Sequence, residues 1–419
     1  MFIIYDLIFF VFTLIYLPVY LFKGKFHQGF LRRLGFFPEG LVFDKPIWIH
    51  AVSVGEVMAM RELINELRHI YPLKKFVIST VTPTGNKIAR SLAKEGDFVT
   101  YLPMDFSFIL KVVIKRIRPC VFIIAETEIW PNLITTLNKF NIPVAILNTR
   151  ISDASFKGYS RIRYLLKPIL DKVNIFCAQS ESDSHKLKVL GASSDKIVVT
   201  GNMKFDQLPT RILDPAIYKK KIGLGAKDML LVAGSTHPGE EIIVLNAYRL
   251  LLNYFPNLRL LIAPRHPERA DEVGSLASNL GLKPEKVSLF RPKAPLQNEV
   301  FILDTVGELV SFYSAADIVF VGGSLVKKGG QNILEPASVG KPVIFGPHMY
   351  NFRDISQAFL DNKAAIQVFN QEDLVLSVTS LLNNNIKVEG LIRNALKVIS
   401  NNRGATGRNI ALISKFIEG

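Results

Sequence analysis

A glycine-rich stretch from Gly322 to Pro347 contains the residue types that bind phosphate groups. Its glycine pairs, Gly322–Gly323 and Gly329–Gly330, have no Cβ and would let the backbone approach a ligand closely. A short helix is expected to begin near Asn332, and the free N–H groups at its start would attract an anion. Glu335 could accept hydrogen bonds from ribose hydroxyls. Alternatively, Asn332 and Glu335 would form a capping box that only stabilises the start of the helix.

Carboxylates follow two apolar, strand-like runs in the first half of the chain. Glu56 ends the loop His50–Glu56, and it could serve as a general base toward a substrate hydroxyl. The alternative is an ordinary acid at a helix N-terminus, where the helix dipole would keep the carboxylate ionised. Glu126 directly follows another run and needs a hydrogen-bonding or cationic partner. Lys204 could neutralise such a carboxylate, or the phosphate of a bound ligand.

Two loops in the second half of the chain are suited to an anion. One contains the hydroxyls of Ser235 and Thr236, and the other, Pro264–Arg269, includes Arg265, whose guanidinium can bind a phosphate through paired hydrogen bonds. The histidines of these loops lack the spacing of metal ligands, so no metal site is expected. With the turn Val306–Glu308, these loops favour one anionic small molecule such as a nucleotide.

The loops lie between short apolar runs that alternate with helical patterns. Runs rich in Ile and Val, apolar on both faces, are typical of parallel strands covered by helices on both sides. In such sheets, ligands bind at the carboxyl ends of the strands. The predicted strands are Ile47–Val52, Phe76–Thr80, Val121–Ala125, Val144–Leu147, Ile175–Ala178, Ile197–Thr200, Met229–Ala233, Leu258–Ala263, Val300–Leu303, Ile318–Val321 and Val343–Phe345.

The chain length and a break near its middle indicate two α/β domains. The chain has 419 residues, enough for two domains of ordinary size. Between the two sets of strands, Gln207–Asp228 contains prolines and glycines and no clear strand. The sequence therefore predicts two doubly wound domains facing each other across a cleft.

The charge balance indicates anionic partners. Lys and Arg number 51 against 36 Asp and Glu, a net charge of +15. No helix-turn-helix, zinc or RNA-binding motif is visible, so nucleic acid is not the expected partner. An anionic membrane surface or a phosphorylated substrate fits better. The two cysteines, Cys120 and Cys177, lie in apolar runs and are expected to be buried free thiols.

Residues 2–22 are almost wholly apolar and have about the length needed to cross a bilayer. Asp6 and Pro18 interrupt this apolar segment. The cations that follow place the rest of the chain in the cytoplasm by the positive-inside rule, and they could bind anionic headgroups as a basic collar. These cations are Lys23, Lys25, Arg32 and Arg33. The alternative is a hydrophobic helix buried in the protein's own fold.

The motifs taken together resemble those of a known family, the 3-deoxy-D-manno-octulosonic acid (Kdo) transferases of Gram-negative lipopolysaccharide synthesis. The resemblance extends from the N-terminal segment to the end of the chain. Seven motifs occur in the order of that family: HAVSVGE, AETEIWPN, GNMKFD, GSTHPGEE, APRHPER, DTVGEL and GGSLVKKGGQNILEPA.

The resemblance implies a GT-B glycosyltransferase fold, in which two Rossmann-like domains face each other across a cleft. It implies a membrane-anchor helix at 1–22, an acceptor domain at 23–207, a CMP-sugar donor domain at 208–402, and a helix at 403–419 that closes back toward the first domain. The donor would be CMP-Kdo and the acceptor a lipid A precursor, with inversion and with no metal or cofactor. The protein would lie at the inner membrane, bound to anionic lipid, with its catalytic domains on the cytoplasmic face.

The resemblance also implies roles for individual residues. Glu56 matches the catalytic base of the family, and Glu126 and Lys204 match residues that stabilise the transition state. Many members have histidine where this chain has Gln331, which can donate a hydrogen bond but cannot hold a charge. The positions matching the CMP site are Pro264, Arg265, Val306, Gly307, Glu308, Asn332, Ile333, Leu334 and Glu335, with possible further donor contacts at Ser235, Gly329 and Gly330.

Two other functions remain open at the level of the sequence. One is a membrane-associated GT-B glycosyltransferase that uses a different nucleotide sugar and a lipid-linked acceptor. The other is a membrane-tethered binding protein that retains the fold without catalysis. The joint presence of Glu56, Glu126 and Lys204 argues against the second.

Overall fold

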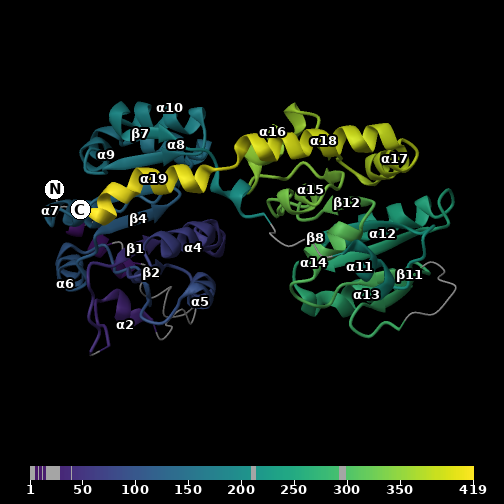
Figure 1. The fold of residues 1–419 in the computed structure, drawn as a ribbon, viewed down its shortest axis with the longest axis horizontal. Coiled ribbons are helices and arrows are strands. Elements are labelled where there is room, and N and C mark those ends of the chain that lie inside the picture. The colour runs from purple at the N-terminus through teal and green to yellow at the C-terminus, as the bar shows by residue number, and fades with distance from the viewer. Residues whose placement is uncertain are drawn as a thin grey trace. The chain divides into compact units, whose positions relative to one another are not determined.

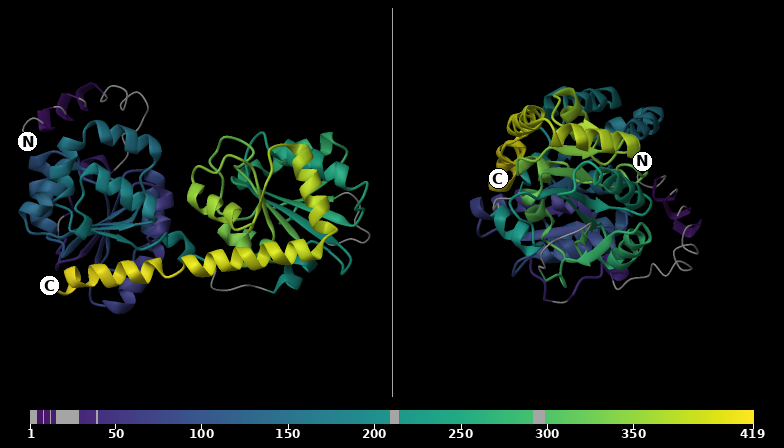
Figure 2. Two further views of the ribbon diagram at one scale, coloured as in Figure 1. Left: turned by 90° about the horizontal axis from the view of Figure 1, so that it is seen from above. Right: turned by 90° about the vertical axis from the view of Figure 1, so that its right-hand side faces the viewer.

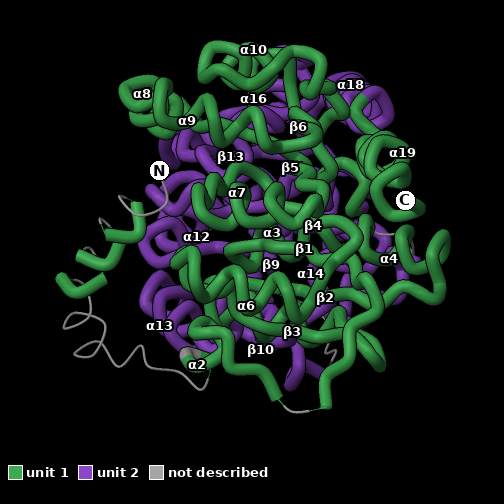
Figure 3. Tube along the Cα trace, turned by 90° about the vertical axis from the view of Figure 1, so that its left-hand side faces the viewer, with its two compact units in different colours: residues 1–207, 402–419 green, residues 208–401 purple. Residues whose placement is uncertain are grey.

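The computed structural model describes residues 5–7, 9–11, 13–15, 29–38, 40–208, 214–291 and 299–419. The chain divides into two compact units (Figures 1 and 3). Unit 1 comprises residues 1–207 and 402–419, and unit 2 comprises residues 208–401. Each unit is built around one parallel sheet of seven strands.

The sheet of unit 1 has the strand order β3-β2-β1-β4-β5-β6-β7, and its strand pairs are all parallel. Alternate residues of β1 enter different cores, since Trp48 packs on one face of the sheet while Ile47 and Ile49 pack on the other. The strands are β1 (Ile47–His50), β2 (Phe76–Thr80), β3 (Phe98–Tyr101), β4 (Val121–Ala125), β5 (Val144–Thr149), β6 (Ile175–Ala178) and β7 (Ile197–Val199).

Helices cover both faces of this sheet. Buried residues of α6, α7, α9 and α10 share one core, and those of α3, α4, α5 and α19 share the other. The helices of unit 1 are α2 (Phe30–Arg33), α3 (Val54–Ala59), α4 (Arg61–Ile70), α5 (Pro83–Leu92), α6 (Ser107–Ile117), α7 (Pro131–Lys139), α8 (Asp153–Arg161), α9 (Arg163–Leu170), α10 (Glu181–Leu190), the 3₁₀ turns η1 (Ser194–Lys196) and η2 (Met203–Asp206), and α19 (Ala405–Glu418).

The sheet of unit 2 has the order β10-β11-β9-β8-β12-β13-β14, again with parallel pairs. Its strands are β8 (Met229–Thr236), β9 (Leu258–Pro264), β10 (Lys283–Lys286), β11 (Glu299–Ile302), β12 (Ile318–Val321), β13 (Val343–Phe345) and β14 (Ile366–Gln367). Its helices are α11 (Pro215–Lys221), α12 (Glu241–Leu251), η3 (Pro267–Arg269), α13 (Ala270–Asn279), α14 (Leu309–Ala315), α15 (Leu334–Ser338), α16 (Arg353–Asp361), α17 (Gln371–Leu382) and α18 (Asn385–Asn402), whose last residue belongs to unit 1.

Every predicted strand is confirmed, within a few residues at its ends. The sequence analysis missed β3, β10 and β14, and each of these is an edge strand of its sheet. An edge strand pairs on one side only and can be short or polar, as in the Lys-Pro-Glu-Lys of β10, so it lacks the apolar run of a central strand. The predicted free thiols are also confirmed, with Cys177 buried and Cys120 half-buried.

The C-terminal helix α19 packs on unit 1, against α4 (Figure 2). Its inward face is apolar, with Ile410, Ile413 and Ile417 buried. The Asp206 carboxylate accepts hydrogen bonds from the backbone N–H groups of Gly404 and Thr406, each at 2.7 Å, which satisfies donors at the start of the helix.

Only part of the predicted membrane anchor falls on described residues. Residues 5–7, 9–11 and 13–15 are helical, and the rest of the segment 2–22 lies outside the described residues, as do Lys23 and Lys25. Among the residues that are described, no helix combines the length and apolar character needed to cross a membrane.

Two of the four cations of the predicted basic collar, Arg32 and Arg33, lie on described residues, and both contact unit 1. Arg32 donates a hydrogen bond to the Val99 carbonyl at 3.0 Å, and Arg33 donates one to the Val81 carbonyl. Their guanidinium groups also lie over the rings of Phe98 and Tyr101. These arginines therefore fasten α2 to the sheet, because carbonyls at the edge of a sheet and aromatic faces attract guanidinium groups.

We expect Gly346→Ala to destabilise unit 2. A Cβ at this position would lie 2.3 Å from the backbone oxygen of Ser324, which cannot move aside as a flexible side chain could. Overpacking of this kind costs roughly 1–3 kcal/mol, so the midpoint of thermal unfolding should fall by several degrees. Gly407→Ala in α19 is the control, because no atom lies within 4 Å of its added Cβ. An unchanged midpoint for Gly346→Ala would contradict this packing.

Candidate active site

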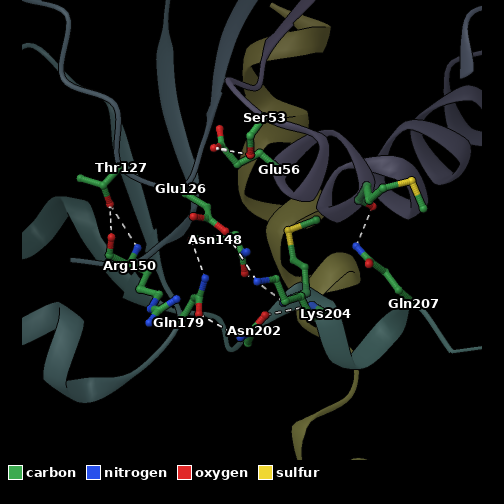
Figure 4. A network of polar contacts seen from close by, with 12 residues as sticks. Ser53, Glu56, Glu126, Thr127, Asn148, Arg150, Gln179, Asn202, Lys204 and Gln207 are labelled. Carbon is green, nitrogen blue, oxygen red and sulfur yellow. Dashed lines mark hydrogen bonds and ion pairs between the residues drawn. The ribbon is translucent and has the colours of Figure 1, made fainter. Parts of the chain in front are cut away.

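Glu56 lies in the first turn of α3, directly after β1, with its carboxylate held in place by hydrogen bonds (Figure 4). One carboxylate oxygen accepts from the backbone N–H of Val52 at 2.6 Å, and the other accepts from the Ser53 hydroxyl at 3.0 Å. Both donors belong to the loop that follows β1, so this loop fixes the direction of the side chain.

The pKa of Glu56 is raised to about 7. Burial is the main cause, and the charges of Glu126 and Glu128 add to it, while the hydrogen bonds from Val52 and Ser53 oppose it. The sequence-based expectation that the helix dipole would keep this carboxylate readily ionised is therefore wrong. Desolvation and two neighbouring acids outweigh the dipole of one short helix, so Glu56 titrates near neutral pH.

Glu126 and Lys204 form an ion pair beside Glu56 (Figure 4). The distance from Lys204 Nζ to Glu126 Oε1 is 3.9 Å, and both side chains are mostly buried. The predicted need of Glu126 for a partner is thus met by a cation. Glu126 also has a positive φ of 59°, an uncommon conformation for a residue with a Cβ, and such strain is often found at functional sites.

Three buried amides position the backbone of Lys204, and the sequence analysis missed them. The Asn148 side chain accepts from the Met203 N–H at 3.0 Å, and the Asn148 carbonyl accepts from the Gln179 amide at 2.9 Å. Asn202 donates to the Gln179 side chain and accepts from the Lys204 N–H, both at 2.9 Å. Asparagine tolerates the positive φ of 55° at Asn148 better than most residues, but nothing in the sequence alone indicates that conformation.

In unit 2, the candidate residues after β8, β9 and β11 lie at the carboxyl edge of one sheet. The Arg265 N–H donates to the Thr236 carbonyl at 2.9 Å, which joins the loops after β8 and β9. Glu335 raises the pKa of the buried Tyr313 phenol and Arg265 lowers it, although burial has the largest effect. The charges of Arg265 and Glu335 therefore both act on this phenol group, and Pro264, the residue before Arg265, ends β9.

The turn Val306–Glu308 precedes α14, which packs against α15. The Val306 side chain is 86% exposed, and Glu308 pairs with Lys221 and accepts a hydrogen bond from Thr305. The Glu308 carboxylate is thus bound by Lys221 and Thr305 of the protein itself. The exposed Val306 side chain offers an apolar surface against which a ligand could pack.

Helix α15 begins at Leu334, so Asn332 is not at the N-cap as the capping hypothesis required. The Asn332 side chain still accepts from the Leu334 N–H and donates to the Glu335 carboxylate, both at 3.1 Å. Ile333 occupies the N-cap position and is buried. Asn332 and Glu335 therefore make local hydrogen bonds of the kind that the capping alternative predicts. The helix, however, starts one residue later than that alternative requires.

Gly329 and Gly330, which the sequence offers as possible backbone contacts for the donor, are also required by the packing of the chain itself. A Cβ at Gly329 would lie 2.2 Å from Asn351 Nδ2, and one at Gly330 would lie 2.2 Å from Met349 Sδ. Both glycines also have positive φ values, 94° and 72°. The chain's own loop fills the space beside these residues, so glycine is required for packing.

A buried carboxylate, Glu240, holds the glycine-rich loop and was not predicted. It accepts hydrogen bonds from the backbone N–H groups of His237, Gly323 and Leu325. Burial raises its pKa to about 7 although these N–H groups lower it. The first acid of the GSTHPGEE motif thus fastens the loop after β8 to the loop after β12.

The surroundings of His237 are electropositive. Its pKa is lowered by burial and by the nearby charges of Lys328, His266, Arg265 and Arg269. Its Nε2 lies 3.1 Å from the side-chain nitrogen of Gln331. A group of cations at strand ends attracts an anionic ligand. Within the described parts of the chain, no three His, Cys, Asp or Glu side chains are grouped so as to hold a metal ion.

Comparison with solved structures defines the class of the fold. A glycosyltransferase from Rickettsia africae matches with a TM-score of 0.61 and 16% identity, covering 90% of this chain and 100% of that one. A putative UDP-N-acetylglucosamine 2-epimerase from Listeria monocytogenes matches with a TM-score of 0.61 and 12% identity, covering 90% and 98%. The two parallel, Rossmann-like sheets therefore form a GT-B fold.

Sequence comparison identifies the family within that class. Residues 28–207 match the family described as 3-deoxy-D-manno-octulosonic-acid transferase, and residues 236–398 match glycosyl transferases group 1. The 3-deoxy-D-manno-octulosonic acid transferase of Haemophilus influenzae is 36% identical over 94% of this chain and 92% of its own length. That of Rickettsia felis is 33% identical over 88% and 79%. The chain belongs to the Kdo transferase family and is a glycosyltransferase.

We expect Gln179→Leu to destabilise unit 1. The substitution keeps a similar volume, but it leaves the Asn202 amide and the Asn148 carbonyl without their partner inside the protein. An unsatisfied buried group costs roughly 1–3 kcal/mol in the free energy of unfolding, which urea titration measures. The control is Gln357→Leu, because Gln357 is exposed on α16 and bonds only to Asp361 in the contacts described. Equal stability of the two variants would rule out a structural role for this amide network.

Proposed function

We propose that this protein transfers Kdo from CMP-Kdo to a hydroxyl group of lipid IV(A), a lipid A precursor, with inversion at the anomeric carbon and without a metal ion. The observation that supports this reaction most directly is the Glu56 carboxylate, whose pKa is about 7, beside the Glu126–Lys204 ion pair. A base with a pKa near the working pH can accept a proton from a sugar hydroxyl and remain ionised for much of the time.

In the proposed reaction, the acceptor oxygen attacks the anomeric carbon of Kdo while Glu56 takes the hydroxyl proton. The bond between that carbon and the phosphate oxygen breaks, and its electron pair leaves with CMP. The new glycosidic bond forms on the opposite face of the sugar, which gives inversion. The hydrogen bonds from Val52 and Ser53 hold the Glu56 carboxylate in one direction before the substrate arrives.

Lys204 would offset the negative charge that develops on the departing phosphate, or the charge of the Kdo carboxylate. Glu126 would hold the lysine side chain in position through their ion pair. The backbone of Lys204 is tied to Asn202, so the base of this side chain is fixed as well. A positioned cation stabilises developing charge without reorganising during the reaction.

Unit 2 would bind the CMP moiety. The cations around His237 and the convergence of Arg265 and Glu335 on Tyr313 favour a nucleotide phosphate near a carboxylate that can bind ribose hydroxyls. The proposed contacts are Pro264, Arg265, Val306, Gly307, Glu308, Asn332, Ile333, Leu334 and Glu335, with Ser235 as a further contact. Gln331 can donate a hydrogen bond there, although it already lies against His237.

The protein would act on the cytoplasmic face of the inner membrane, where a lipid acceptor is embedded. The net charge of +15 and the apolar segment 2–22 are suited to an anionic membrane surface and a phosphorylated lipid. The competing function is that of a membrane-associated GT-B glycosyltransferase that uses a different nucleotide sugar as donor. Turnover with a UDP-sugar but not with CMP-Kdo would establish that function.

Glu56→Gln tests the proposed base. The amide keeps the shape of the side chain but cannot accept the proton, so kcat for Kdo transfer to lipid IV(A) should fall by roughly 10²–10⁴-fold. Product bands resolved by chromatography, with CMP-Kdo made in situ, measure the rate. CMP binding, measured by calorimetry, should be unchanged because its proposed site lies in unit 2. Full activity of the variant would discard Glu56 as the base.

The pH dependence provides a second test. Because Glu56 must be deprotonated to accept a proton, kcat should rise as pH increases through about 7 and then level off. Glu128→Gln removes one negative charge that raises the pKa of Glu56, so the rise should move to lower pH. Glu66→Gln on the exposed side of α4 is the matched control and should leave the profile in place. A profile that did not move in Glu128→Gln would contradict this electrostatic coupling.

A further inference from the structure

The helical residues of the N-terminal segment are fastened to unit 1 by a carboxylate. One oxygen of Asp6 accepts from the Ser107 N–H at 3.0 Å and from the Asn132 side chain at 2.7 Å, and the other accepts from the Ser107 hydroxyl at 2.6 Å. Phe9 packs against Phe106 with ring centroids 5.0 Å apart. The residue that interrupts the apolar sequence is therefore one that attaches these helical residues to the folded unit.

Helix α2, which follows the segment in the chain, is attached to the same unit. Arg32 and Arg33 of α2 donate hydrogen bonds to the carbonyls of Val99, in the edge strand β3, and Val81, directly after β2. Asp6 and α2 are thus both fixed to unit 1, and only residues 7–28 connect Asp6 to Gly29. These 22 residues could cross a bilayer once, since a crossing takes about 20 residues, but not twice. A single crossing would put the two ends on opposite sides of the membrane, which their common attachment to unit 1 forbids.

The outward side of the attached helix is apolar. Leu7, Phe10, Val11, Leu14 and Ile15 are each about half to two-thirds exposed. Their spacing places them on one side of a helix, opposite Asp6 and Phe9. Among the described residues of unit 1, none covers this side. A helix that buries one apolar side and exposes another is suited to the surface of a membrane.

Helix α6 extends this face. Phe108 and Val112 are 64% and 62% exposed, and Phe108 stacks on Phe106, the residue that contacts Phe9. Lys111, Lys115 and Arg116 are exposed on the same side of α6, at i+3, i+7 and i+8 from Phe108. Helix α6 contains no acid. Apolar side chains with interleaved cations match an anionic bilayer surface, in which acyl chains lie beneath negative headgroups.

We propose that the N-terminal segment does not span the membrane, and that Asp6 holds its described helical residues along unit 1. Residues 5–7, 9–11 and 13–15 and α6 then form one face bound to an anionic lipid surface. The proposal rests on the membrane location given above, and it specifies how the protein is held there. The N-terminus then stays on the same side of the membrane as the catalytic units. Asp6 acts as a positioning residue and has no contact with the substrate.

Labelling of a cysteine tests which side of the membrane the N-terminus occupies. A cysteine on a short Gly-Ser extension before Met1 is added to the full chain, and spheroplasts are treated with a membrane-impermeant maleimide. We expect this cysteine to react only after the spheroplasts are lysed. Labelling of the unextended protein measures the background reaction of Cys120 and Cys177. Reaction in intact spheroplasts would overturn the proposal, while the transfer assay with Glu56→Gln tests the proposed function separately.

Asp6→Leu and Asp6→Asn, in the extended protein, test the carboxylate. Leucine removes every hydrogen bond to Ser107 and Asn132 and makes the segment more apolar, so it should release the helix to cross the bilayer and allow labelling in intact spheroplasts. Asparagine is neutral as well but keeps an acceptor oxygen, so it should leave the N-terminus inaccessible until lysis. Equal protection of the two variants would overturn the role of Asp6.

Vesicle binding tests the lipid face. The double variant Phe108→Ser, Val112→Ser should bind phosphatidylcholine vesicles containing phosphatidylglycerol more weakly than the unmodified full chain does. The affinity should fall by about tenfold or more, because each substitution removes a large apolar side chain from the interface. Leu73→Ser, at a residue 93% exposed outside this face, is the control. Transfer to acceptor solubilised in detergent should be unchanged in the double variant. Unchanged vesicle binding would overturn the assignment of this face.

Discussion

The parallel pairing of β1, β4 and β5 at the centre of the unit 1 sheet is the constraint on which the candidate active site depends. β4 lies between the other two, with Ile49 opposite Ile123 and Ala125 opposite Leu147. Parallel strands end at the same edge of a sheet, so the loops that follow them lie side by side. Glu56 follows β1, Glu126 follows β4, and the end of β5 contributes Asn148, which supports the residue before Lys204. A shift in the register of β4 would separate these groups.

The same site shows how chemical reactivity competes with stability. Glu56 is placed where burial and two acids disfavour its charged form, which raises its pKa to about 7. Because the folded pKa is raised above that of the unfolded chain, the contribution of Glu56 to stability is largest in acid and is lost as pH rises through about 7. Glu126 and Asn148 also have positive φ values, and strain of this kind costs roughly 1–3 kcal/mol per residue. The surrounding sheet must supply the compensating stability.

Carboxylates that accept backbone N–H groups recur wherever distant segments meet. Asp105 accepts from Asn132 and Leu133 at the start of α7, and Asp206 accepts from Gly404 and Thr406 at the start of α19. Glu240 joins two loops of unit 2 in the same way. A carboxylate has two oxygens with several acceptor positions, so one side chain can satisfy donors from separate segments. Asp6 belongs to this group, which explains an acid within an otherwise apolar sequence.

The sequence by itself determined the class of the fold, the central strands and the residues that could do the chemistry. Local apolar patterns are sufficient for these, because a central parallel strand is buried on both faces and must be apolar throughout. Only the tertiary structure decided the edge strands, the pKa of Glu56, the amides behind Lys204 and the purpose of Gly329 and Gly330. It also decided that Asp6 within the N-terminal apolar segment and helix α2 beyond it attach to one unit. Each of these depends on which distant groups surround a residue, and neighbours in space are not neighbours in the sequence.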